Sequence, residues 1–363
     1  MMACNQHNLN TINAISIDHV HFYVEDAEAW RRWFVQVLGF QWVGRWMRSD
    51  THTEIVESGD ISFRLSAPLT ANSAVANYLQ QHPPGVANVA FRVADLNTVL
   101  QAAQAIGALV SSVSDSGGQR SVQIRGWGDL LHTVIEATSA TAASPNSKAG
   151  MVQPFTTIDH VVLNVGVGEL DAALTYYESL FGFQRQQNFA IRTDRSALCS
   201  QVLAHPNARI QFPINEPGSP SSQIQEFLDL NQGAGIQHIA LQTQNILQTI
   251  AQLRNQGLSC LSVPVSYYEQ LRQRPGFSLS PEEWQAVMTQ EVLVDWPANI
   301  PQALLLQTFT QPIFQQPTFF FELIERRLYR DHDRYQQTQG FGEGNFQALF
   351  EAIEREQMKR GKL

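Results

Sequence analysis

The stretch "IDHVHFYVEDAEAWRRWFVQVLGFQ" at residues 17–41 decides the fold, because it recurs as "IDHVVLNVGVGELDAALTYYESLFGFQ" at residues 158–184. Each copy starts with the alternation of a β-strand, continues as an amphipathic helix and ends on Gly-Phe-Gln, which opens another strand. A second repeat pairs "GVANVAFRVADLNTVLQAAQAIGA" (85–108) with "GIQHIALQTQNILQTIAQLRNQGL" (235–258). Similarity between separate parts of one chain indicates that a single supersecondary unit is used several times.

The two halves of this repeat are separated by "TSATAASPNSKAG" at residues 138–150, which is small, polar and free of periodicity, as in a linker. We therefore predict an α+β fold of two domains, residues 1–150 and residues 151–363, each built from a pair of β-α-β-β-β modules.

Composition and charge narrow the classes of function. The chain has 363 residues, of which 44% are hydrophobic and 16% charged, as in a globular protein with a sizeable core. Its formal net charge of −9, without any basic run, argues against a nucleic-acid partner or an anionic membrane surface. Three widely spaced cysteines (Cys4, Cys199 and Cys260) suggest neither a disulfide framework nor a thiolate zinc site. With no signal-like start and no apolar run long enough to span a bilayer, we expect a cytoplasmic protein.

Candidate metal ligands differ between the two halves. The first half offers, on three matched strands, His19, Asn88 and Glu136, and the second half offers His160, His238 and Glu322. Loss of a neutral imidazole removes an important donor for a divalent transition metal. We interpret the N-terminal half as a non-catalytic scaffold and the C-terminal half as the catalytic domain.

No local motif links the three C-terminal residues, and a single histidine on an apolar strand is more often a core residue than a ligand. Glu322 is harder to explain in that way, because it follows "TFFF" and an unpaired buried carboxylate is costly. Two imidazoles and one carboxylate form the facial set that suits non-heme Fe(II), with three coordination positions left open. We therefore favour a metal site.

The neighbouring residues suggest a pocket with polar and aromatic walls. Gln237 directly precedes His238, so strand alternation predicts that it faces the opposite way, at the rim or behind the ligands. Gln307 shares a strand face with Phe309, and Phe320 shares one with Glu322.

The closing segment "GFGEGNFQALFEAIEREQMKRGKL" at residues 340–363 has three glycines followed by good helix formers. We predict a helix at about residues 345–360, with Asn345 as its N-cap and with Lys359 and Arg360 at its C-terminal end. It either packs one apolar stripe on the body or forms a hinged lid that places Phe341 and Phe346 over a pocket.

These segments, together with "PINEP", "SQIQEFL", "GAGIQHIAL", "LLLQTFT" and "PTFFFELIER", resemble the 4-hydroxyphenylpyruvate dioxygenase family of the vicinal oxygen chelate superfamily. The resemblance covers both halves, and the closing segment is its most specific part. It implies glyoxalase-like open barrels with a C-terminal gating helix, and it makes His160, His238 and Glu322 the iron ligands. The polar pocket positions that it implies are Ser200, Asn215, Gln223, Gln237 and Gln307. The lining and lid positions that it implies are Phe309, Phe320, Phe341, Asn345, Phe346 and Leu349. One departure from the family's pattern is the "FFF" before Glu322, whose side chains are bulkier than those expected at these positions.

The resemblance also implies the reaction. One Fe(II) per chain and dioxygen would convert 4-hydroxyphenylpyruvate, an aromatic 2-oxo acid, to homogentisate and carbon dioxide without 2-oxoglutarate. Homogentisate could serve tyrosine catabolism or prenylquinone biosynthesis, and the sequence leaves both open. The main alternative is a hydroxymandelate synthase, which is expected to depart from the "PxNEP" pattern. An extradiol dioxygenase and a non-enzymatic binding protein of the same superfamily are more remote. A homo-oligomer, either a dimer or a tetramer, is the default for such enzymes.

Overall fold

The computed structural model of the chain describes residues 15–138, 153–193, 196–206 and 210–361. Almost all of the predicted linker at 138–150, and the N-terminal residues 1–14, lie outside the described residues. Within them, no helix is long and apolar enough to cross a membrane.

The N-terminal half is one eight-stranded sheet in the order β2-β3-β4-β1-β5-β8-β7-β6. Its strands are β1 Ile15–Tyr23, β2 Gln41–Met47, β3 Thr51–Ser58, β4 Ile61–Pro68, β5 Gly85–Val93, β6 Ser114–Ser116, β7 Gln119–Arg125 and β8 Leu131–Glu136. Its helices are α1 Ala27–Gln36, α2 Ala74–Gln81 and α3 Leu96–Ala105. Each module therefore contributes one half of a curled sheet, and the first strands of the two modules, β1 and β5, meet antiparallel at its centre.

The C-terminal half repeats this order as β10-β11-β12-β9-β13-β16-β15-β14. Its strands are β9 Thr157–Asn164, β10 Gln184–Arg192, β11 Ala197–Ala204, β12 Gln211–Pro217, β13 Gly235–Gln242, β14 Leu293–Asp295, β15 Leu305–Phe309 and β16 Phe320–Arg326, followed by a separate hairpin of β17 Leu328–Asp331 and β18 Arg334–Gln337. Its helices are α4 Leu170–Phe181, α5 Gln223–Asn231, α6 Ile246–Asn255, α7 Val265–Gln273, α8 Pro281–Thr289 and α9 Glu343–Lys359. The identical strand order confirms the predicted α+β fold of paired modules.

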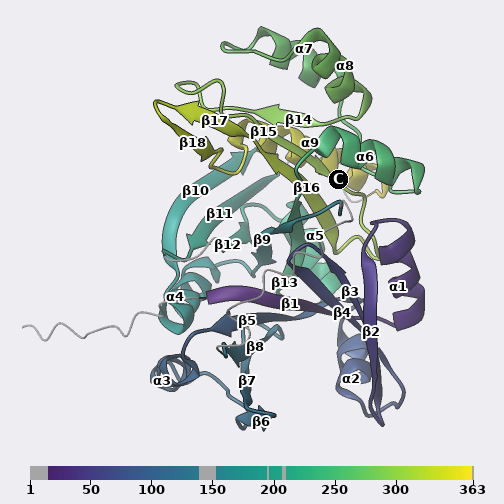
Figure 1. Cartoon of the computed structure of the whole chain (residues 1–363), viewed down its shortest axis with the longest axis vertical. Helices are drawn as coiled ribbons and strands as arrows, with labels where there is room; N and C mark the ends of the chain where they lie inside the picture. The colour runs from purple at the N-terminus through teal and green to yellow at the C-terminus, as the bar shows by residue number, and fades with distance from the viewer. Residues whose placement is uncertain (1–14, 139–152, 194–195, 207–209, 362–363) are drawn as a thin grey trace, which may run out of the picture.

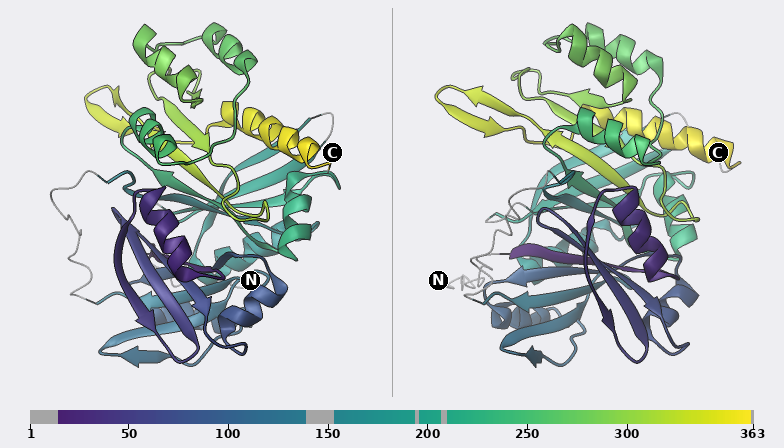
Figure 2. Two further views of the ribbon diagram at one scale, coloured as in Figure 1. Left: turned by 90° about the vertical axis from the view of Figure 1, so that its right-hand side faces the viewer. Right: turned by 45° about the vertical axis from the view of Figure 1, so that its right-hand side comes forward.

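The two sheets lie one above the other along the long axis of the molecule (Figure 1), and α9 lies beside the strands of the C-terminal sheet (Figure 2). Helices α7 and α8 interrupt the last module and lie at the end of the molecule far from the N-terminal sheet (Figure 1).

A continuous aromatic core joins the two halves. Phe22 on β1 makes an edge-to-face contact with Phe319 at a centroid distance of 5.2 Å, and Phe63 on β4 stacks on Phe321 at 5.9 Å. Phe319 and Phe321 are both buried, and Phe320 between them faces the other side of β16. The "FFF" triplet therefore serves two purposes, since its outer residues hold the halves together and its middle residue lines the pocket described below.

Strand register corrects one of the residue matches between the halves. On the paired strands, Val93 of β5 lies opposite Glu136, and Ala240 of β13 lies opposite Glu322. Ala240 corresponds to Ala90 in the repeat. Ala90 lies three residues before Val93 and is therefore opposite Thr133, three residues before Glu136. Thr133 thus occupies the position of Glu322 in the first half. Glu136 instead accepts a hydrogen bond from the first amide of α3, Leu96 N, at 3.0 Å.

Glu325 accepts the matching bond from Ile246 N of α6 at 2.7 Å, so it is the true counterpart of Glu136. The interpretation that Glu136 matches Glu322 was wrong because both strands carry a glutamate near the same end. The first half thus differs at two of the three candidate ligand positions, where Asn88 Nδ2 donates to Thr133 Oγ1 at 2.8 Å.

A buried histidine between the halves makes the stability of the fold pH-dependent. His132 Nδ1 donates to Val89 O at 2.9 Å, and its Nε2 lies 3.0 Å from the hydroxyl of Tyr177. Burial lowers the pKa of His132 to about 4, although the bond to Val89 O opposes the shift. Between pH 6.5 and 4 the unfolded chain binds a proton that the folded chain does not. The free energy of unfolding should therefore fall by roughly 3 kcal/mol as the pH drops through this window.

Urea unfolding of the His132→Gln variant between pH 4 and 7.5 should show a flatter pH dependence than the wild type. The matched control is His332→Gln, because the His332 side chain is 94% exposed. Parallel curves for the wild type and His132→Gln would contradict the assignment.

Candidate metal centre and substrate pocket

Three neighbouring strands bring His160, His238 and Glu322 together. On β9 and β13, His160 lies opposite Ala240, and on β13 and β16 Ala240 lies opposite Glu322. One potential ligand atom from each of the three residues lies within 4.8 Å of the others. His160 Nε2 is 3.2 Å and His238 Nε2 is 3.7 Å from Glu322 Oε2. All three residues are buried, so two imidazoles and one carboxylate converge on a single point inside the protein.

The charge balance of this cluster favours a cation. Burial by itself would lower the pKa of His160, but the carboxylates of Glu322 and Asp159 raise it to about 9. Burial and the neighbouring His160 hold the pKa of His238 well below its usual value. Without a metal, one proton on His160 therefore balances Glu322, and a divalent metal would replace that proton.

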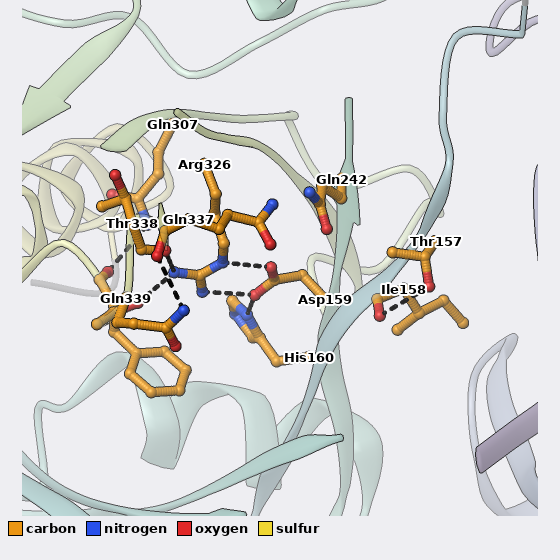
Figure 3. A network of polar contacts seen from close by, with 12 residues as sticks. Thr157, Ile158, Asp159, His160, Gln242, Gln307, Arg326, Gln337, Thr338 and Gln339 are labelled. Atoms are coloured by element: carbon orange, nitrogen blue, oxygen red, sulfur yellow. Dashed lines mark hydrogen bonds and ion pairs between the residues drawn. The ribbon is translucent and has the colours of Figure 1, made fainter. Parts of the chain in front are cut away.

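A buried ion pair orients His160 (Figure 3). Asp159 Oδ1 accepts a hydrogen bond from His160 Nδ1 at 2.9 Å, which leaves Nε2 directed at Glu322. Arg326 binds the same carboxylate through Nε and Nη2 at 2.6 and 2.8 Å. Burial opposes ionisation of Asp159, but Arg326 and His160 hold the pKa of its carboxyl well below the usual value. An ionised carboxylate behind a histidine is the arrangement that fixes the tautomer of a metal ligand.

Gln307 supports Glu322 and does not line the pocket, which corrects the expectation drawn from the resemblance. Its Nε2 donates to Glu322 Oε1 at 2.8 Å and to Phe341 O at 2.9 Å, and its Oε1 accepts from Asn345 Nδ2 at 2.8 Å. The side chain is completely buried. With Glu322 Oε1 occupied in this way, Oε2 is left to face the two histidines.

A pocket with an empty volume of about 640 Å³, including its mouth, opens directly above the three residues. This size suits a small organic ligand. Of the predicted residues, eleven line it: His160, His238, Glu322, Ser200, Asn215, Gln223, Gln237, Phe320, Phe341, Phe346 and Leu349. The polar members lie on β11, β12, β13 and the start of α5, and most of the aromatic and aliphatic members lie on α9 and the segment before it.

The prediction that Gln237 faces away from His238 was wrong. Ile236 pairs with Leu163 and His238 with Val162, so Gln237 is an extra residue without a partner on β9. Such a bulge breaks the alternation of side chains. Both Gln237 and His238 therefore line the pocket.

Phe309 and Asn345 do not line this pocket either. Phe309 packs against Phe320 behind the wall, at a centroid distance of 6.3 Å. Asn345 is not the N-cap of α9, because the helix starts at Glu343 after Gly342, which has a φ of +73°. Its side chain is used elsewhere, since Oδ1 accepts from the hydroxyl of Tyr267 at 2.8 Å while Nδ2 binds Gln307.

Several pocket residues were not predicted from the sequence: Val162, Phe189, Ile191, Leu198, Val202, Pro213, Ile224, Phe350 and Ile353. Phe189 is the most informative, because it pairs with Ser200 across β10 and β11 and contacts Phe346 at 5.1 Å. Phe350 and Ile353 belong to the apolar stripe of the terminal helix. The helical periodicity of that stripe is therefore the sequence feature from which these two pocket residues could have been predicted.

Another group of metal-binding residue types occurs among the described residues, at Glu28, His52 and Glu54. There, Arg45 Nη2 lies 3.0 Å from Glu54 and 3.2 Å from Glu28, so a guanidinium already neutralises the carboxylates. This group is therefore a network of ion pairs.

Replacing Gln307 by leucine should weaken metal binding about 10- to 100-fold, because Glu322 loses the donor that orients it. Titration with Co²⁺ followed by its absorption spectrum measures this directly. The matched control is Gln223→Leu, because Gln223 lines the pocket without a hydrogen bond to His160, His238 or Glu322. It should retain metal affinity and lose substrate affinity. Equal metal affinity in Gln307→Leu and the wild type would contradict this role.

Comparison with known proteins agrees with the fold. The profile of the glyoxalase/bleomycin resistance protein/dioxygenase superfamily matches residues 157–274, and a second profile of the same description matches residues 18–124. The 4-hydroxyphenylpyruvate dioxygenase of Yarrowia lipolytica is 36% identical over 378 residues, covering 95% of this chain and 93% of the relative. That of Caenorhabditis elegans is 36% identical over 379 residues, covering 96% and 93%. A mutant of 4-hydroxymandelate synthase from Streptomyces coelicolor has a TM-score of 0.82 at 25% identity, covering 94% of this chain and 98% of that one.

Two open barrels with a buried His-His-Glu cluster in one of them define a two-domain member of this superfamily. Within it, the chain belongs to the 4-hydroxyphenylpyruvate dioxygenase family.

Proposed function

We propose that this protein is an Fe(II)-dependent dioxygenase that converts 4-hydroxyphenylpyruvate and dioxygen to homogentisate and carbon dioxide. The observation that carries the proposal is the convergence of His160, His238 and Glu322 at the base of a pocket whose walls are polar on one side and aromatic on the other. The similarity of almost the whole chain to named 4-hydroxyphenylpyruvate dioxygenases supports the same substrate.

The residues present fit one Fe(II) per chain. Glu322 is a buried carboxylate, and in the described part of the chain its Oε2 forms ion pairs with the two histidines and with no lysine or arginine. Two nitrogens and one oxygen are the donor set of non-heme Fe(II) sites, in which open positions remain for substrate and dioxygen. When bound, Fe(II) would supply dioxygen activation, using electrons from decarboxylation of the substrate's own 2-oxo acid, so that no 2-oxoglutarate is needed.

The protein's own groups would orient the ligands, hold the substrate and exclude water. Asp159 keeps His160 in the tautomer whose Nε2 is free, and Phe320 stacks on His238 at 4.7 Å. Phe341 contacts the His160 ring at 5.3 Å, so apolar groups cover the cluster from the pocket side. A dry wall of this kind protects a reactive intermediate from water.

Polar groups on the opposite wall would hold the oxygen atoms of the substrate. Asn215 Nδ2 donates to Asn164 Oδ1 at 3.1 Å, which leaves Asn215 Oδ1 for a ligand. Among the described residues, the buried Gln223 Oε1 has no hydrogen-bond donor. A hydroxyl group on a substrate ring could donate to either acceptor.

We further propose that residues 1–150 form a non-catalytic domain and residues 151–363 the catalytic domain, with α9 as its gating helix. In the first half, the positions matched to the three ligands hold His19, Asn88 and Thr133, and Asn88 and Thr133 bind each other. His19 keeps an aspartate partner, Asp18, at 2.6 Å, so the histidine-carboxylate pair remains where the other two donors have been lost.

A hydroxymandelate synthase is the second candidate, because a protein of that activity shares the fold over nearly the whole of both chains. Pro213 and Asn215 of the "PxNEP" pattern line the pocket and favour the dioxygenase. The test is anaerobic loading with Fe(II), then oxygen uptake with 4-hydroxyphenylpyruvate and analysis of the product. Homogentisate supports the proposal, whereas 4-hydroxymandelate would establish the alternative, and stoichiometric iron without oxygen uptake would reject both.

The proposal includes a cytoplasmic homo-oligomer of two or four chains, as is common for enzymes of this size. Cell fractionation and light scattering of the purified protein test these two points.

A further inference from the structure

We propose that Arg326 is a positioning residue that couples closure of the gating helix α9 to metal binding, through a continuous hydrogen-bonded path from the hinge to His160. This inference rests on the proposed function, since it takes His160 as a metal ligand and α9 as a lid.

The hinge is the segment 338–342, which joins β18 to α9. Two of its glycines have positive φ, +89° at Gly340 and +73° at Gly342, so the backbone there adopts a conformation that other residues avoid. Arg326 Nη1 donates to the backbone oxygens of Thr338 at 3.2 Å and Gly340 at 2.7 Å. The guanidinium therefore binds two backbone oxygens of the hinge, one on each side of Gln339.

The other edge of the same guanidinium faces the metal centre (Figure 3). Its Nε and Nη2 form the paired bonds to Asp159, and Asp159 holds His160 Nδ1. Arg326 and Asp159 are both 9% exposed, so water does not compete strongly for these bonds. Because a guanidinium is planar and rigid, a shift of the hinge carbonyls must tilt it and disturb its bonds to Asp159.

A second path reaches Glu322. Gln307 binds Glu322 Oε1 and the hinge oxygen of Phe341 with the same amide nitrogen, and Asn345 of α9 binds its Oε1. Glu322 is thus one side chain away from the hinge and His160 is two side chains away, and the two paths approach the hinge from different strands. His238 has no such connection, since its Nδ1 has no hydrogen-bond partner among the described residues.

Coupling of this kind is reciprocal: a bound metal should stabilise the closed helix by the same factor by which closure strengthens metal binding. A purely structural role for Arg326 predicts otherwise. In that case, replacing Arg326 lowers the stability of the whole domain, while a bound metal slows hydrogen exchange in α9 by the same factor as in the wild type.

The experiment is hydrogen exchange of the full chain with and without Co²⁺, followed by mass spectrometry of peptides that cover residues 338–360. In the wild type, Co²⁺ should slow exchange in these peptides at least about fivefold, the lower end of ordinary coupling. In Arg326→Lys, which keeps the charge but loses the planar fork, this metal-dependent slowing should fall below about twofold. Co²⁺ affinity should fall about 10- to 100-fold.

The matched control is Arg327→Lys, because Arg327 pairs with Glu283 and Glu325 and its side chain contacts neither Asp159 nor the hinge. It should respond to Co²⁺ as the wild type does. If Arg326→Lys does not fold, the double variant Asp159→Asn/Arg326→Gln removes both buried charges together and keeps the histidine's hydrogen-bond acceptor. It should bind Co²⁺ without the change in exchange at residues 338–360.

Wild-type slowing retained in either Arg326 variant would overturn the inference, as would Co²⁺ binding to the wild type without any slowing. Failure of the proposed function has a different signature, because a wild type that binds no Co²⁺ would remove the metal site itself.

Discussion

Replacing His238 by alanine is expected to abolish turnover and to weaken iron binding by more than about 100-fold. Changes to groups that merely support a ligand already cost 10- to 100-fold, so losing a ligand should cost more. The remaining pair, His160 and Glu322, would still be 3.2 Å apart, but two donors do not make the facial set. Iron content after anaerobic loading and oxygen uptake measure the two effects separately.

The matched control is His19→Ala, because His19 occupies the position of His160 in the other half and also binds an aspartate. It should keep both iron and activity, since no metal-binding pair remains beside it. Normal iron content in His238→Ala, or loss of iron in His19→Ala, would contradict the assignment of the metal site to the C-terminal half.

Replacing Gly342 by alanine is expected to damage both the lid and the metal centre. A Cβ atom at this position would lie 2.1 Å from Gln307 Oε1 and 2.9 Å from its Cδ. Gln307 cannot move aside cheaply, because it is buried and holds Glu322, Phe341 and Asn345 at once. Either Glu322 loses its donor or the start of α9 shifts. Metal affinity should fall about 10- to 100-fold, and less product should form per dioxygen consumed.

Gly340→Ala separates this clash from backbone strain. Its φ of +89° is equally unfavourable for alanine, but a Cβ there would meet nothing within 4 Å. It should destabilise the folded protein by the cost of that strain, about 1–3 kcal/mol, which is measured as a lower melting temperature, and it should leave the product-to-oxygen ratio unchanged. If the two variants behave alike, strain alone accounts for the effect and the contact with Gln307 is unimportant.

The sequence alone determined the architecture of this protein and the strands that carry its candidate metal ligands. Hydrophobic periodicity and the internal repeat are local properties, so the order of strands and helices could be predicted from them. The change from Asn88 to His238 within the repeat distinguished the two halves. The closing glycines and helix formers also predicted α9 to within two residues of its start.

Tertiary structure alone decided which side chains meet. The pairing of β13 with β16 joins segments that are far apart in the sequence, so local patterns did not fix its register. The sequence therefore matched Glu322 with Glu136, whereas the register matches Glu322 with Thr133.

 The bulge at Gln237 depends on the same kind of pairing, because an extra residue in β13 exists only relative to β9.

Gln307 and Asn345 show the same limit in side-chain contacts. The resemblance implied a polar pocket position for Gln307 and a lining or lid position for Asn345. Both amides instead bind each other, and Glu322 and Tyr267 take up their remaining groups. The partners come from β15, α9, β16 and α7, which are far apart in the chain. A buried amide binds whichever donors and acceptors the packing brings to it, since leaving it unpaired is costly. Local periodicity specifies which face of a strand or helix is buried, but only the packed structure specifies what that face touches.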